Sequence, residues 1–149
     1  SMEPNFHDKE FVLTEKVSYK RREPHRGEVV VFKAPPSEPC AENECEYIKR
    51  VIGLPGETIR ILNDRIWING DPLYEEYLPL DFKTASGSYL REGKPLIVPQ
   101  GQYLLLGDNR SHSRDGREFG TTPKEDIVGR AFFRYWPTDR VGLIEHADY

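Results

Sequence analysis

The amino-acid sequence predicts an all-β protein with a coiled, antiparallel, barrel-like core, an inserted β-hairpin lobe and one short helix. Several short segments are rich in β-branched and aromatic residues, Asn-Asp and Asn-Gly pairs stand where hairpins would turn, and only one segment carries convincing helix signals. With 149 residues, of which 37% are apolar and 31% charged, the chain is long enough for one folded domain with a hydrophobic core.

Strands are predicted toward both ends of the chain. Residues 9–19 and 27–34 are joined by a connection that carries turn formers, and residues 46–52 form a third strand. The segments "QYLLL" and "VGRAFFRYW" supply two further strands after residue 101. These segments together predict the barrel-like core.

The middle of the chain predicts a separate lobe. Residues 57–74 indicate consecutive hairpins, because isoleucines alternate with polar residues around an Asn-Asp and an Asn-Gly pair. Residues 75–101 are irregular, and within them residues 81–95 indicate an exposed loop. We therefore expect residues 57–101 to form a hairpin lobe inserted into a core of residues 1–56 and 102–149.

The one expected helix lies in the segment "TTPKEDIVG". Thr122 is suited to the N-cap, Pro123 to the first helical position, and Glu125 to the return bond of a capping box. Gly129 would end this helix after one or two turns.

Charge and cysteine content limit the possible functions. The net charge of −4 argues against a nucleic-acid partner, because no basic stripe extends beyond residues 20–22. No apolar stretch approaches the roughly 18 residues of a membrane-spanning helix. Cys40 and Cys45 cannot complete a four-ligand zinc site, so they are either free thiols or a disulfide that closes a small acidic loop. We favour the disulfide, which requires an oxidising compartment.

A lysine stands in the middle of the predicted strand "EYIKRVI". Side chains alternate across a strand, so Tyr47, Lys49 and Val51 are expected on one face, and Arg50 on the other as a solvated or ion-paired charge. A strand lysine is ordinarily a surface residue whose charged end reaches water. If burial lowered its pKa, however, the neutral amine would be able to take the proton of a serine hydroxyl.

Four segments resemble the sequence boxes of the type I signal peptidase (leader peptidase) family, membrane-bound serine proteases that remove signal peptides from exported proteins. "SMEPNF" resembles the nucleophile box, "RGEVVVF" the Arg-Gly-Asp box, "YIKRVIGLPGE" the general-base box and "GDNRSHSRDGR" the last box. One such match would be weak, but four in the right order cover the chain nearly end to end. The resemblance implies a fold of the signal-peptidase type and a Ser/Lys catalytic dyad.

The resemblance assigns roles to the matching positions. Ser1 would be the nucleophile and Lys49 the general base. Ser113 would orient the lysine, while Asp115 and Arg117 would form an ion pair that holds the loop in shape. Contacts to the substrate would come from three more residues: Met2, Tyr47 and Ile48.

The resemblance also implies partners, location and cofactor use. The expected partners are signal peptides of exported pre-proteins, cut at Ala-x-Ala-type sites, and the surface of the lipid bilayer, with no nucleic acid and no metal or nucleotide cofactor. The expected location is the outer, extracytoplasmic face of the cytoplasmic membrane, held by an anchor that the sequence as given lacks. Aromatic candidates for contact with the bilayer are Phe6, Phe11, Tyr135 and Trp136, although for Phe11 core packing is the better expectation.

Departures from the family pattern leave other interpretations open. Asn5 replaces the usual Thr, Glu28 and Glu57 replace Asp, and Gly116 replaces Ser. The histidines fit no triad and are expected to be solvated: His7, His25, His112 and His146. The alternatives are a self-cleaving repressor-type Ser/Lys protease, an N-terminal nucleophile enzyme, or a non-catalytic β-barrel interaction module.

Overall fold

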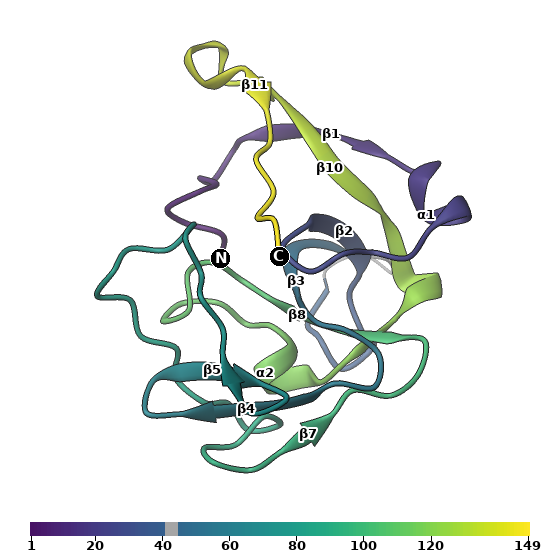
Figure 1. Ribbon diagram of the computed structural model, residues 1–149. Helices are drawn as coiled ribbons and strands as arrows, with labels where there is room; N and C mark the ends of the chain where they lie inside the picture. Colours follow the sequence, from purple (N-terminus) through teal and green to yellow (C-terminus); the bar gives the residue numbers. More distant parts are fainter. Residues whose placement is uncertain (41–44) are drawn as a thin grey trace.

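The structure, a computed structural model, describes residues 1–40 and 45–149, and a seven-stranded antiparallel sheet is its largest element (Figure 1). The strand order is β1-β10-β2-β3-β8-β9, and β11 pairs with β10 at the side of this path. The strands are β1 (Phe11–Glu15), β2 (Val29–Lys33), β3 (Glu46–Gly53), β8 (Gln102–Leu106), β9 (Thr122–Pro123), β10 (Ile127–Trp136) and β11 (Gly142–Leu143).

A second, four-stranded sheet has the order β6-β5-β4-β7 and lies at the opposite end of the molecule from β11 in Figure 1. Its turns have the backbone that the sequence predicts, because Asn63, Asp64, Asn69 and Gly70 all have positive φ angles. The strands are β4 (Thr58–Leu62), β5 (Arg65–Ile68), β6 (Asp71–Pro72) and β7 (Leu96–Ile97).

One hydrophobic cluster joins the two sheets. Ile52 of β3 and Leu104 of β8 pack with Ile59 and Ile61 of β4, and all four residues are fully buried. The second sheet thus shares its core with the first, although it lies within the range predicted for the inserted lobe. The division of the chain into core and lobe stays a prediction.

The helix predicted at Thr122 is wrong. Thr122 and Pro123 form β9, which pairs with Tyr103 and Gln102 of β8, and only a three-residue 3-10 turn, η1 (Lys124–Asp126), follows. Because the backbone of Thr122 belongs to a strand ladder, its side chain does not cap a helix.

The α-helices lie elsewhere. The first, α1 (Ser18–Arg21), replaces the end of the strand predicted up to Tyr19, since the Glu15 carboxylate accepts hydrogen bonds from two backbone N–H groups at the start of the turn. The second is α2 (Gly116–Phe119), and a 3-10 turn, η2 (Thr138–Arg140), follows β10. Both α-helices have four residues, and none of the helices in the described ranges is long and apolar enough to cross a bilayer.

Candidate active site

Ser1 and Lys49 meet although they lie far apart in the sequence. Strand β3 carries Lys49, and Ser1 opens the turn that precedes β1. The Lys49 Nζ donates a hydrogen bond of 2.7 Å to the Ser1 Oγ. The Ser1 carbonyl accepts a hydrogen bond of 3.1 Å from the Asn109 N–H, so the N-terminal segment, β3 and the loop after β8 converge here.

The Lys49 side chain is buried. Only 3% of the residue is exposed, and its Nζ lies 5.5 Å from the centre of the Tyr47 ring. Desolvation lowers the pKa of Lys49 to about 8, although the Asp115 and Asp108 carboxylates act to raise it. A substantial fraction of the amine is therefore neutral near physiological pH, which is what a general base requires.

The neighbouring Arg50 is also buried, with 2% of its surface exposed. Its Nε and Nη2 donate to the Asp108 carboxylate at 2.9 and 2.7 Å, and its Nη1 donates to the Gly27 carbonyl at 2.9 Å. Of the two states expected for Arg50, the structure shows the ion pair, because both faces of β3 are covered from Lys49 onward.

The loop after β8 is held by buried carboxylates. Asp115 accepts hydrogen bonds of 2.9 Å from both the Nε and the Nη2 of Arg117, and one of 3.0 Å from the Gly107 N–H. These contacts hold the pKa of the Asp115 carboxyl below its usual range despite burial. Asp108 also accepts a hydrogen bond of 2.8 Å from Asn5 Nδ2, and this bond connects the Ser1 segment to the same loop.

Arg110 is a structural residue of this loop to which the sequence reasoning gave no role. It is fully buried, and it donates hydrogen bonds of 2.9 Å to the Gly107 carbonyl and the Thr84 Oγ1 and pairs with Glu75. The position of Arg110 in the last box, "GDNRSHSRDGR", is the sequence feature that could have indicated this structural role. It connects the candidate site to the segment between the two strands β6 and β7.

Ser113 does not contact Lys49 by a hydrogen bond in this structure. Its Oγ is buried without a hydrogen-bond partner among the described residues. It lies against Gly107, where an added Cβ would stand 2.0 Å from this Oγ and 2.5 Å from the Ser1 carbonyl oxygen. Gly107 is therefore needed for the close approach of three segments, and the orienting role of Ser113 stays a prediction.

A cleft of about 430 Å³ opens beside Ser1 and Lys49. Strand β3 pairs with β2 from Glu46 to Arg50, but its pairing with β8 begins only at Arg50. The other edge of β3 before Arg50 therefore has no strand beside it among the described residues, and its backbone groups are available to an extended peptide. The lining residues are Ser1, Glu46, Tyr47, Ile48, Lys49, His112 and Arg114.

Comparisons with known proteins agree with this geometry. The family model described as "Signal peptidase, peptidase S26" matches residues 1–136. The chain belongs to the signal peptidase family. This membership confirms the resemblance of the four boxes and argues against a repressor-type protease or an N-terminal nucleophile enzyme.

The similar proteins include signal peptidases from three bacteria. The chain is 42% identical to a probable signal peptidase I-2 of a Synechocystis species, over 97% of this chain and 63% of that protein. It is 37% identical to signal peptidase IB of Staphylococcus aureus, over 92% of this chain and 74% of that protein. The crystal structure of a signal peptidase I from Enterococcus faecalis matches with a TM-score of 0.58 and 30% identity, over 73% of this chain and 97% of that chain. The all-β fold class is confirmed, and the chain spans less than two thirds of the Synechocystis relative.

Two side chains expected at the surface of this family member are buried instead. Met2, predicted to contact substrate, is 2% exposed and does not line the cleft. Phe6, a candidate for membrane contact, is buried in the same hydrophobic cluster. Both pack with Val29 because the N-terminal turn folds back on β2. Phe11, expected in the core, is exposed.

The segment before β3 contacts Arg114, which lines the cleft. A disulfide joins Cys40 and Cys45, whose Cα atoms lie 5.9 Å apart, and residues 41–44 lie outside the described part of the chain. Glu38, which the sequence reasoning missed, has a fully buried side chain that accepts two hydrogen bonds from Arg114 Nε, at 2.9 and 2.7 Å. It also raises the pKa of Tyr47 together with desolvation, the larger cause.

One histidine corrects the expectation of solvated side chains. The Nδ1 of His146 accepts a hydrogen bond of 3.0 Å from the Val29 N–H, because the C-terminal segment lies along β2. Desolvation and the nearby Arg130 lower the pKa of His146 to about 4, so it is neutral at physiological pH.

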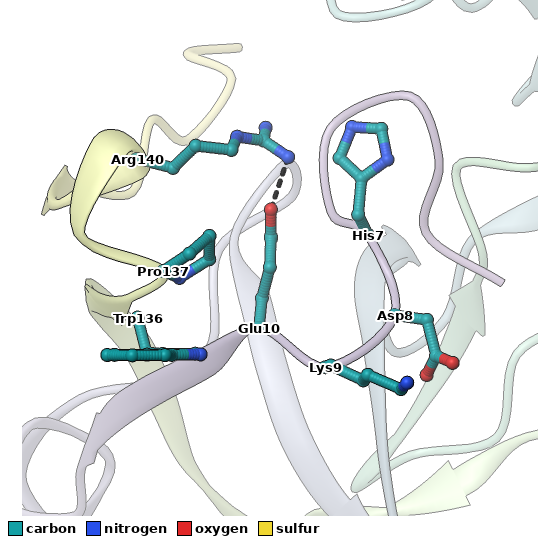
Figure 2. A pocket seen from close by; sticks show the side chains of 7 residues that line it. All are labelled: His7, Asp8, Lys9, Glu10, Trp136, Pro137 and Arg140. Carbon is teal, nitrogen blue, oxygen red and sulfur yellow. Dashed lines mark hydrogen bonds and ion pairs between the residues drawn. The ribbon is translucent and has the colours of Figure 1, made fainter.

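A separate hollow of about 360 Å³ lies beside β1 and η2, and Ser1 and Lys49 do not line it (Figure 2). His7 and Trp136 stand at its edges, and Arg140 reaches across it to Glu10. Glu10 also pairs with Arg134 at 2.9 Å, so this one carboxylate is the partner of two guanidinium groups. We assign this hollow no part in catalysis.

Proposed function

We propose that this chain is the catalytic part of a type I signal peptidase, which removes signal peptides from exported pre-proteins at Ala-x-Ala-type sites through a Ser1/Lys49 dyad. The observation that carries the proposal is the hydrogen bond of 2.7 Å between the buried Lys49 Nζ and the Ser1 Oγ. A lysine whose pKa is lowered by burial toward physiological pH can take the proton of a serine hydroxyl that it contacts. This arrangement activates a serine nucleophile.

The chemistry follows from these two side chains. The Ser1 Oγ attacks the scissile carbonyl carbon while the neutral Lys49 amine takes the hydroxyl proton. The tetrahedral intermediate then collapses to an ester on Ser1, and the lysine ammonium gives its proton to the leaving amine. A water molecule, deprotonated by Lys49, attacks the ester, and return of the proton to the Ser1 Oγ releases the signal peptide. Asp115 and Arg117 hold the loop after β8 in shape without touching the reacting atoms.

We propose that the substrate docks along the open edge of β3. An extended peptide there would pair its backbone with residues 46–48 and place its scissile carbonyl beside Ser1. Ile48 would then shape the shallow sites that admit small side chains, and Tyr47 would contact the peptide from the other face of β3. We also place the protein on the extracytoplasmic face of the cytoplasmic membrane, with exposed Phe11, Tyr135 and Trp136 against the bilayer and no nucleic-acid partner.

Cleavage of an Ala-x-Ala signal-peptide substrate in detergent tests this proposal. The full-length protein is compared with its Ser1→Ala and Lys49→Ala variants, and circular dichroism checks that all three are folded. We expect cleavage at the Ala-x-Ala site by the unchanged protein and a loss of at least about a thousandfold in each variant. Equal cleavage by all three would reject the dyad, and absence of cleavage by all three would favour the interaction module.

A further inference from the structure

Arg114 presents an unused part of its guanidinium group to the substrate cleft. Its side chain is 58% exposed, whereas the Glu38 side chain that holds it is 0% exposed. Both hydrogen bonds to Glu38 use the Arg114 Nε, and the two terminal nitrogens have no partner among the described residues. Glu38 therefore fixes the position of Arg114, and within residues 1–40 and 45–149 its outer N–H donors stay open to a ligand.

The two faces of β3 differ at the cleft. Tyr47 and Lys49 share one face, and Glu38 and Arg114 lie with Tyr47 on this side. Ile48 lies on the other face, where it packs against the cluster that contains Met2. One face thus offers donors for an anion, and the other offers an apolar surface.

An extended peptide beside β3 would show the same alternation. Its first and third residues before the cut would face one side, and the middle residue would face the other. Small side chains at the first and third positions fit the apolar surface at Ile48. The middle residue of the Ala-x-Ala sequence then faces Arg114, and its side chain meets a positive charge.

We propose that Arg114 is a specificity-determining residue that favours an acidic side chain at the middle position of Ala-x-Ala, and that Glu38 is the positioning residue that holds it. This inference rests on the proposed function, because it uses the docking of the substrate along β3. His112 lines the same cleft and is exposed. Among the described residues, the only side chain that forms a hydrogen bond with its ring is the neighbouring Ser111.

The test compares three peptide substrates that differ only in the middle residue: Ala-Asp-Ala, Ala-Asn-Ala and Ala-Lys-Ala. We expect the full-length protein at pH 9, where Lys49 is mostly neutral, to cleave the Asp peptide with about fivefold higher kcat/KM than the Lys peptide. Arg114→Gln should bring this ratio close to one, and Arg114→Lys should keep part of it. Arg60→Gln, at an exposed arginine on β4 away from the cleft, is the matched control and should leave the ratio unchanged.

Two further measurements keep the test decisive. Arg114→Gln strands the buried Glu38 carboxylate, so the double variant Glu38→Gln/Arg114→Gln, which leaves no buried charge, should lose the preference as well. The Ser1→Ala protein serves for peptide binding by fluorescence anisotropy, which does not require catalysis, and its affinities should show the same order.

The outcomes separate this inference from the proposed function. Cleavage of all three peptides at equal rates, or a ratio that Arg114→Gln does not change, would overturn the inference and leave the peptidase proposal standing. Charge-dependent binding that disappears with Arg114→Gln, but without cleavage, would support the inference and reject the proposed activity.

Discussion

The protonation state of Lys49 sets the pH dependence expected at the scale of single residues. Burial lowers its pKa to about 8 from the usual 10.5, so Lys49 loses its proton around pH 8 instead of around pH 10.5. We expect kcat/KM for a minimal peptide to increase about tenfold per pH unit below this value and to level off above it. A pH–rate profile between 6 and 10 measures this, and a flat profile would contradict Lys49 as the base.

The same shift predicts a pH-dependent stability. Between about pH 8 and 10.5 the unfolded chain binds more protons at Lys49 than the folded chain, so the free energy of unfolding should rise with pH across this window. Below it, the folded state bears the full cost of a buried ammonium, about 3 kcal/mol. Lys49→Met should therefore remove this rise and stabilise the fold at pH 7, as urea unfolding at several pH values would show. Lower stability of Lys49→Met at pH 7 would argue against a desolvated lysine.

Asp108 is the buried partner of Arg50 and of Asn5, so removing its charge has a large expected cost. Asp108→Asn leaves the Arg50 guanidinium without a counter-charge, and we expect a loss of about 3–5 kcal/mol in the free energy of unfolding. Asp64→Asn is the matched control, because the Asp64–Lys83 pair is exposed and should contribute less than about 0.5 kcal/mol. Equal effects in urea unfolding would show that the Arg50–Asp108 pair does not stabilise the site.

At the scale of elements, the pairing of β1 with β10 depends on one glycine. A Cβ at Gly129 would stand 2.2 Å from the Glu15 carbonyl oxygen, so Gly129→Ala must push β1 away from β10. We expect a loss of about 1–3 kcal/mol in the free energy of unfolding, measured by urea denaturation. Gly142→Ala on β11, where an added Cβ meets no atom within 4 Å, is the control and should change little. Equal losses in the two variants would reject the steric argument.

Local sequence signals predicted the strands and hairpins of this fold but not its helix positions. The Asn-Asp and Asn-Gly turns could be predicted because their positive φ angles depend only on the turn residues themselves. Thr122 carries a good capping signal, but its pairing with Tyr103, nineteen positions away, overrides the local preference. Such pairings depend on the whole sheet, so a short window cannot reveal them.

At the scale of the whole molecule, the candidate site forms where distant segments meet. The family boxes predicted Ser1, Lys49 and the Asp115–Arg117 pair, which the structure brings together. Glu38 lies outside every box, and its burial against Arg114 follows only from how two loops pack. Residues matched to a family motif are thus accessible from sequence, whereas contacts that shape the cleft require the fold.

The apolar surface at one end of the molecule gives the last prediction. Trp136 of β10 and Leu143 of β11 are exposed together with Phe11 of β1, and β10 pairs with both β1 and β11. In Figure 1 they lie at the end opposite the second sheet. Burying two such side chains at the level of the lipid headgroups should contribute on the order of 2 kcal/mol to membrane binding.

The double variant Trp136→Ser/Leu143→Ser should therefore reduce partitioning into phosphatidylglycerol-containing vesicles by at least about tenfold in a sedimentation assay. Its kcat/KM for a short soluble peptide should stay unchanged, because neither residue lines the cleft at Ser1. Leu80→Ser is the control: Leu80 is 97% exposed, in the segment between β6 and β7, and should not alter vesicle binding. Loss of binding in the control alone would place the membrane contact on the second sheet's side of the molecule.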